Sequence, residues 1–164
     1  TPEAPDTPTA LSGQKPQEII SITKEMVIDA RNSLSTPKAH EIDCVALGSP
    51  HFSNNECRAL LALADKKRFK VPVFICTGRH TMADLEHDGA DEDLKNLGVT
   101  FVVDTCVVVT PILPEQTGIM MTNSAKFAHY AEGNTGYAPV FGSLIDCVKS
   151  AQSGQLIWDN SVWS

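Results

Sequence analysis

The sequence predicts an α/β fold, namely a mostly parallel sheet of about five strands with helices on both faces. Short apolar runs alternate with amphipathic segments along the chain, and the apolar runs lack the alternation of a half-exposed strand. Strands and helices of this length are joined compactly as right-handed β–α–β crossovers, which gives a parallel sheet. At 164 residues, the chain is long enough for one such domain.

The chain is predicted to divide into a linker, one domain and a tail. Residues 1–16 hold four of the ten prolines and almost no bulky apolar side chain, so burial cannot offset the entropy that they would lose on ordering. We expect them to form a flexible, proline-rich linker. The α/β domain is predicted over residues 17–155, and the tail over residues 156–164 carries Trp158 and Trp163.

The first helix is predicted to run from Pro16 to about Leu34. Its apolar side chains recur at the spacing of one helical face, and they are Ile19, Ile22, Met26, Val27 and Ala30.

The next elements are two strands, each followed by a helix. Residues 42–47 form an apolar run that stops at Gly48, and a capping-box pattern from Ser53 to Glu56 then predicts the start of a helix. The apolar face of that helix consists of Cys57, Leu60, Leu61 and Ala64. Residues 71–76 predict the second strand, and residues 81–97 a more polar helical stretch broken near Gly89.

The second half of the domain repeats the pattern. Residues 100–103 predict the third strand, whose apolar character allows a continuation into residues 107–109 before Pro111 and Pro114 end regular pairing. The remaining strands are predicted over residues 119–121 and 140–141, and the remaining helices over residues 124–130 and from the N-cap Ser143 to Ala151.

Charge and composition exclude several classes of protein. The formal charge of −7 offers no cationic surface for a phosphate backbone or an anionic membrane, so we expect no nucleic-acid and no membrane partner. No apolar run approaches the roughly 20 residues of a membrane span, and the first residues lack the pattern of a secretory signal. We therefore expect a soluble, cytoplasmic protein.

The five cysteines are expected to be mostly reduced thiols. Their number is odd, and no C-x-x-C pair is present. Cys44, Cys57 and Cys147 fall at strand-interior or apolar-face positions and are expected to be packed in the core. Cys76 closes a strand, and its role stays open. Cys106 follows Asp104 and Thr105 near a strand end, where a thiolate could be a metal ligand or a nucleophile.

Polar residues follow the carboxyl ends of the predicted strands, where parallel sheets bind ligands. At this edge, His51 and His129 could act as acid, base or hydrogen-bond donor, and Arg79 and Lys126 could hold a carboxylate or a phosphate. Each has a structural alternative, because lone charged residues are commonly surface groups. The other small polar side chains at this edge are Ser49, Thr77, Asn123 and Ser124.

Five strings of the sequence resemble, in the same order, the C-terminal part of the catalytic subunit of the aconitase X family. They are VALGSPHFSNNECRAL (45–60), FICTGRH (74–80), VVDTCVVVTPI (102–112), MTNSAKFAHYAEGNTG (121–136) and VFGSLIDCVKSAQSG (140–154). The resemblance covers roughly residues 42–155, and the DTC and TNSAKxAHY strings are its most specific parts.

The resemblance implies one lobe of an aconitase-like iron–sulfur dehydratase that eliminates water from a β-hydroxy acid. Its family includes cis-3-hydroxy-L-proline dehydratases and archaeal mevalonate 5-phosphate dehydratases, and the GSPHFS and TGR strings favour the former. By match to the DTC string, Cys106 is expected to be a ligand of an iron–sulfur cluster whose nuclearity stays open. Some family members carry Cys where this chain has Ser49.

The roles of the other edge residues follow from this resemblance as expectations. Arg79, Lys126, Asn123 and Thr77 would bind the hydroxy-acid substrate, and Ser49, His51, Ser124 or His129 would handle protons or hydroxyls. The family's subunit is longer, so this chain would need further lobes and a swivel domain, fused or separate. The start at Thr1 suggests a processed product or a piece of a longer polypeptide.

Two other functions are compatible with the residues alone. A non-catalytic, flavodoxin-like module could bind a small phosphate-bearing ligand at the same edge, and an enzyme could use Cys106 as a nucleophile.

Overall fold

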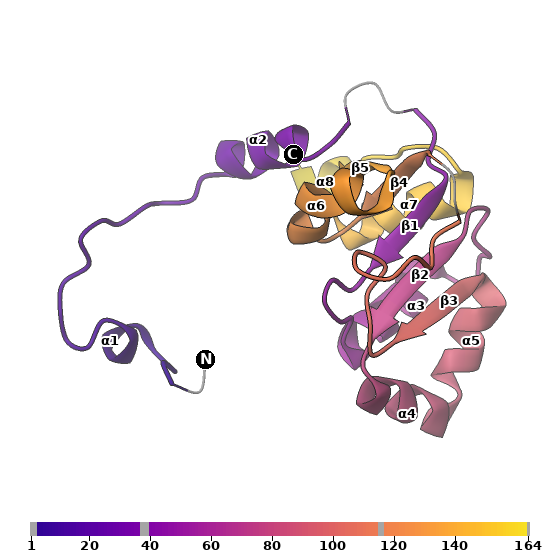
Figure 1. Cartoon of the computed structure of the whole chain (residues 1–164), viewed down its shortest axis with the longest axis horizontal. Coiled ribbons are helices and arrows are strands. Elements are labelled where there is room, and N and C mark those ends of the chain that lie inside the picture. The colour runs from indigo at the N-terminus through magenta and orange to yellow at the C-terminus, as the bar shows by residue number, and fades with distance from the viewer. Residues whose placement is uncertain (1–2, 37–39, 115–116, 164) are drawn as a thin grey trace.

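A five-stranded sheet forms the centre of the domain in the computed structural model, which describes residues 3–36, 40–114 and 117–163 (Figure 1). Its strands are all parallel and lie in the order β3-β2-β1-β4-β5. Their bounds are β1 Cys44–Leu47, β2 Val73–Thr77, β3 Val99–Val103, β4 Ile119–Thr122 and β5 Ala138–Phe141. The predicted α/β fold with about five parallel strands is confirmed.

Helices cover both faces of the sheet, but unequally. One face packs against four helices, which are α3 (Asn54–Ala64), α4 (Arg79–Asp88), α5 (Ala90–Leu97) and α7 (Leu144–Ser153). The other face packs against α6 (Ala125–Thr135) and against the apolar side chains of the loop that follows β3, including Val107 and Leu113. This loop therefore occupies a place where an α/β sheet commonly carries a helix.

The helix boundaries follow from local capping. Ser53 and Glu56 form a complete capping box at the start of α3, and Ser143 forms the same arrangement with Asp146 at α7. Gly89 adopts a left-handed conformation with φ of 78° and separates α4 from α5, as the sequence predicts.

The predicted helix from Pro16 is wrong over residues 16–23. The observed helix α2 spans Lys24–Ser33, and Thr23 caps it by accepting a hydrogen bond from the backbone N–H of Met26 at 3.3 Å. The preceding residues belong to no helix or strand. The β-branched isoleucines there have low helix propensity, and no packing in the described domain compensates for it.

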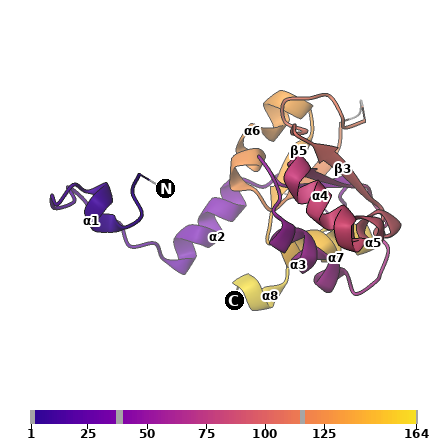
Figure 2. The same cartoon turned by 90° about the horizontal axis from the view of Figure 1, so that it is seen from below.

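The N-terminal segment extends away from the sheet (Figure 2). Within the predicted linker, Asp6 caps a one-turn helix, α1 (Thr7–Ala10). Residues 1–2 of that linker and residue 164 of the predicted tail lie outside the described residues.

The continuation of the third strand into residues 107–109 does not occur. Asp104 adopts a left-handed φ of 59° directly after β3, and this conformation turns the chain out of the strand direction. Residues 107–109 then form a turn that closes over the sheet. Elsewhere the differences concern element ends: α6 extends to Thr135, and β5 begins at Ala138.

The C-terminal tail packs on α7 and carries the short helix α8 (Asn160–Trp163). The buried carboxylate of Asp146 accepts hydrogen bonds from the backbone N–H of Asp159 at 2.5 Å and from Nε1 of Trp163 at 2.7 Å. The guanidinium of Arg31 lies 4.6 Å from the ring centres of both Trp158 and Trp163, which joins α2 to the tail. Among the described residues, no helix has the length and apolar character needed to cross a bilayer.

Candidate functional site

The loop after β1 is held against β2 by a close backbone approach at Gly48. The backbone N–H of Phe52 donates to the carbonyl of Cys76 at 2.7 Å, and the buried hydroxyl of Thr77 donates to the carbonyl of Phe52 at 2.7 Å. Gly48 has φ of 76°, and a Cβ at this position would lie 2.3 Å from the carbonyl oxygen of Cys76. A residue without a side chain is therefore required to bring Ser49 to the carboxyl edge of the sheet.

Ser49 meets Cys106 at this edge. The thiol of Cys106 donates to Oγ of Ser49 at a distance of 3.7 Å, and Cys106 is half-buried. Ser49 is held from the other side, because the hydroxyl of Ser124 donates to its carbonyl oxygen at 3.3 Å. Three residues from three different loops thus form one connected group.

Cys76 interacts with Cys106 from below, inside the core. The backbone N–H of Val107 donates to the sulfur of Cys76 at 3.4 Å. Burial raises the pKa of the Cys76 thiol to about 12. The predicted packing of Cys44, Cys57 and Cys147 agrees with their burial, which raises the pKa of Cys44 to about 12, that of Cys57 to about 11, and that of Cys147 further. All five thiols are free, and Cys106 is the one that is not fully buried.

Cys106 and Lys126 share a cavity of about 420 Å³. Lys126 lies in the first turn of α6, whose N-cap is Ser124, and both thiol and ammonium line the same space. Most of the remaining wall is apolar or aromatic. Its full lining is Ser49, Pro50, Cys106, Val108, Val109, Lys126, Phe127, Tyr130 and Asn134.

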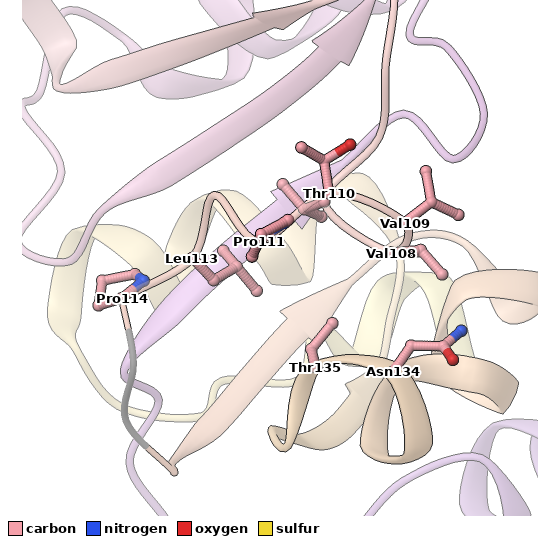
Figure 3. Close-up of a pocket in the computed structure, with 9 residues that line it drawn as sticks. Val108, Val109, Thr110, Pro111, Leu113, Pro114, Asn134 and Thr135 are labelled. Carbon is pink, nitrogen blue, oxygen red and sulfur yellow. The ribbon is translucent and has the colours of Figure 1, made fainter.

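A second cavity of about 480 Å³ continues along α6 toward its carboxyl end (Figure 3). Val108, Val109 and Asn134 line both cavities, so the two spaces adjoin. In Figure 3, Val108 and Leu113 of the loop lie opposite Asn134 and Thr135 of α6. The loop after β3 therefore forms one wall of a continuous depression.

Arg79 lies at the same edge but outside the lining of these two cavities. Its backbone N–H donates to Oδ1 of Asp104 at 2.9 Å, and its Nε donates to Oδ2 at 2.6 Å. The backbone hydrogen bond from Arg79 is the main reason why the pKa of Asp104 is lowered. The Arg79 side chain remains 75% exposed. Its two hydrogen bonds to Asp104 hold the turn that precedes Cys106, and its predicted role in substrate binding stays a prediction.

The other predicted site residues are placed differently. His51 is exposed and lies close to Gly78 and Asp104, on the Arg79 side of the edge. His129 stacks edge-on against Tyr130 at 4.8 Å and lines a separate cavity with residues 33–36. Thr77 is fully buried, and its hydroxyl donates to the carbonyl of Phe52. Asn123 is half-buried between β4 and α6.

The structure thus brings Ser49, Cys106 and Lys126 to one cavity. Ser124 does not line this cavity but bonds to the carbonyl of Ser49. Arg79, His51 and His129 also lie outside the lining. Sequence reasoning missed the apolar wall formed by Val108, Val109 and Phe127. A signal for it existed in the apolar run 107–109, which precedes Pro111 and Pro114 and cannot extend a regular strand.

The described residues do not hold a metal centre by themselves. No group of three or more His, Cys, Asp or Glu side chains among them could bind an ion. Iron–sulfur clusters generally use three or four thiolates, whereas the cavity offers the thiol of Cys106 alone. This donor set fits one ligand position of a cluster, and the other ligands would have to come from elsewhere.

A parallel α/β sheet with Cys106, Ser49 and Lys126 at its carboxyl edge defines the class to which this chain belongs, an α/β domain with a candidate ligand site at the edge where such sheets bind ligands. Comparison with known families specifies that class. Residues 42–153 match the family described as Aconitase X third domain. The chain therefore belongs to the aconitase X family, as its sequence strings predict.

Several characterised relatives cover most of the chain. A cis-3-hydroxy-L-proline dehydratase from Pseudomonas aeruginosa is 38% identical over 94% of this chain, and one from Hypocrea jecorina is 36% identical over 94%. A phosphomevalonate dehydratase large subunit from Methanocaldococcus jannaschii is 30% identical over 80%. The chain spans 27%, 27% and 32% of the lengths of these relatives.

The fold also matches a solved structure of the family. The crystal structure of Thermococcus kodakaraensis aconitase X, in its holo-form, superposes with a TM-score of 0.70 at 26% identity, covering 80% of this chain and 34% of that chain. The sheet and helices described above therefore share the fold of one part of that longer aconitase X chain.

Proposed function

We propose that this chain is one lobe of a hydro-lyase that eliminates water from cis-3-hydroxy-L-proline. The observation that carries the proposal is the cavity in which the thiol of Cys106, the hydroxyl of Ser49 and the ammonium of Lys126 line one space. The two relatives named cis-3-hydroxy-L-proline dehydratase, each at least 36% identical over 94% of the chain, support the choice of reaction.

The charge of the cavity favours this substrate over a phosphorylated one. Lys126 is the cationic side chain in its lining, and Arg79 is engaged with Asp104 outside it. One ammonium suits a single carboxylate, and the apolar wall of Val108, Val109 and Phe127 suits the carbon atoms of a small ring. Mevalonate 5-phosphate carries a phosphate as well as a carboxylate, so it would leave one anionic group without a cation from this lobe.

The chain's own residues have distinct proposed roles. Lys126 holds the substrate carboxylate at the first turn of α6, where the helix N-terminus adds to its positive potential. Ser49, fixed by the Ser124 hydrogen bond, presents its hydroxyl beside the thiol and can pass or hold a proton. His51, His129 and Ser124 are not part of the lining of this cavity, so proton handling is assigned to Ser49, and Ser124 has the role of positioning it.

Cys106 is proposed to be one ligand of an iron–sulfur cluster. When bound, such a cluster supplies a Lewis-acidic iron that accepts the departing hydroxyl. The position of Ser49, 3.7 Å from the thiol of Cys106, is adjacent to this ligand. The remaining ligands are proposed to come from the lobes of the enzyme that the chain does not span. Five free thiols suit a reducing cytoplasm, which we propose as its location.

Substrate assays on the full-length enzyme test this function. We expect turnover of cis-3-hydroxy-L-proline, measured by the absorbance of the pyrroline product, and no turnover of mevalonate 5-phosphate. Lys126→Gln should lower kcat/KM about 10- to 100-fold, because it removes a charge-assisted hydrogen bond of about 1.5–3 kcal/mol. Lys66→Gln, at the opposite edge of the sheet, is the matched control and should leave kcat/KM unchanged. Turnover of mevalonate 5-phosphate alone would refute the proposal.

A further inference from the structure

Residues 17–27, here called the apolar arm, carry large hydrophobic side chains that the domain does not cover. The exposed fractions of Ile19, Ile20 and Ile22 are 80%, 63% and 70%, and Met26 and Val27 at the start of α2 are also exposed. Five such residues within nine positions form a far denser apolar surface than the single exposed side chains that are normal on a soluble protein.

The backbone of the arm also has unused hydrogen-bonding capacity. Residues 17–22 belong to no helix or strand, and within the described part of the chain their N–H groups make no backbone hydrogen bond. An exposed segment that combines apolar side chains with open N–H and C=O groups is typical of a peptide that is recognised by another surface.

The opposite end of α2 is fixed to the domain. The guanidinium of Arg31 lies between the two tryptophan rings of the tail, and the backbone N–H of Thr36 donates to the carbonyl of Pro139 at 2.7 Å. These contacts direct the arm away from the sheet (Figure 2). The apolar arm is therefore presented outward from a rigid attachment.

The relatives show that the arm belongs to sequence that the family shares. The Pseudomonas dehydratase matches 94% of the 164 residues, which leaves about 10 unmatched, so the arm from residue 17 onward lies within the matched part. The third-domain match begins only at residue 42. The arm thus precedes the third domain yet belongs to the shared sequence, and the chain makes up only 27% of that relative.

We infer that the apolar arm docks into an apolar groove on the remaining lobes of the enzyme and fastens this lobe to them. The inference rests on membership of the aconitase X family rather than on the proposed reaction. The surface that covers the arm then belongs to other lobes of the same enzyme, and not to a second copy of this lobe or to an unrelated protein.

Hydrogen exchange on the full-length enzyme tests this docking without substrate, so its result does not depend on activity. We expect the amides of residues 17–23 to exchange at least about tenfold more slowly than those of an unstructured peptide. The double variant Ile20→Asp/Ile22→Asp should restore fast exchange. Leu63→Asp, which introduces an aspartate at an exposed leucine of α3, is the control and should leave the arm protected. Fast exchange of the arm in the unaltered enzyme would overturn the inference.

A photo-cross-linking amino acid in place of Ile20 identifies the occupant. Cross-links to peptides of the same enzyme outside the residues of this chain support the inference. Cross-links to the third domain itself, or between two copies of the enzyme, would contradict it.

Discussion

At the scale of single residues, the site depends on backbone geometry as much as on reactive side chains. Gly48 permits the approach that places Ser49, and Asp104 turns the chain so that Cys106 reaches the cavity. Asp104 is itself held by two hydrogen bonds from Arg79. Gly48, Asp104 and Arg79 therefore decide where the thiol and the hydroxyl lie, although none of the three lines the cavity.

Gly48→Ala should destabilise the protein by about 3 kcal/mol, the upper end of the cost of a strained backbone conformation. The added Cβ would meet the backbone atoms Cys76 O at 2.3 Å and Phe52 N at 2.5 Å, neither of which can move freely. Urea denaturation measures the effect. Gly136→Ala is the matched control, because Gly136 has the same φ of 76° but open space around it. Equal losses for both variants would show that the close approach is unimportant.

At the scale of helices and strands, local sequence signals determined the boundaries wherever they were strong. The capping box at Ser53, the N-cap Ser143 and Gly89 mark α3, α7 and the break between α4 and α5, and the structure confirms each. The helix from Pro16 failed because periodicity shows that one face is apolar, not that anything covers it. The run 107–109 was ambiguous, because a buried turn and a buried strand are equally apolar.

Ser53→Ala should destabilise the chain by about 1 kcal/mol, since it removes an N-cap and one half of a capping box. Chemical denaturation provides the measurement. Ser21→Ala is the control, because Ser21 lies in the exposed arm and caps no helix. A loss below about 0.3 kcal/mol for Ser53→Ala would contradict the role assigned to this cap.

The attachment of the tail to α7 should depend on pH. The hydrogen bond from Lys149 lowers the pKa of Asp159 to about 2, below its ordinary value near 4. A depressed folded-state pKa stabilises the fold above the unfolded-state value, and this contribution is lost as the pH falls from about 4 toward 2. The melting temperatures of the wild type and Lys149→Met should therefore differ at pH 7 and converge near pH 2. A difference that persists at pH 2 would contradict this assignment.

At the scale of the whole molecule, the chain belongs to the aconitase X family and matches about a quarter of its longer relative from Pseudomonas aeruginosa. The parallel sheet, its carboxyl edge and the residues crowded there could be predicted from sequence, because uninterrupted apolar runs and strand-end polar residues are local signals. Which of those residues share a cavity could not be predicted. Arg79 pairs with Asp104 beside the cavity, and His129 lines another cavity together with residues 33–36. Both arrangements join parts of the chain that are distant in sequence, so no local pattern indicates them.

The cavity alone does not meet the needs of the proposed reaction. Within the described residues it supplies one accessible thiol and one ammonium, fewer than the proposed cluster and substrate require. The exposed apolar arm gives an independent reason to expect further lobes beside this one. Both observations agree with the comparison of lengths, in which the chain spans 27% of each of the two cis-3-hydroxy-L-proline dehydratases.

The most direct test of the account is the visible absorption spectrum and iron content of the full-length enzyme, reconstituted without oxygen, for the wild type and Cys106→Ser. The account predicts that the wild type binds iron and absorbs in the visible range, and that Cys106→Ser loses both together with dehydratase activity. Cys57→Ala, at a thiol on the buried face of α3, should retain all three. A Cys106→Ser enzyme that keeps its iron, its colour and its activity would contradict the central claim.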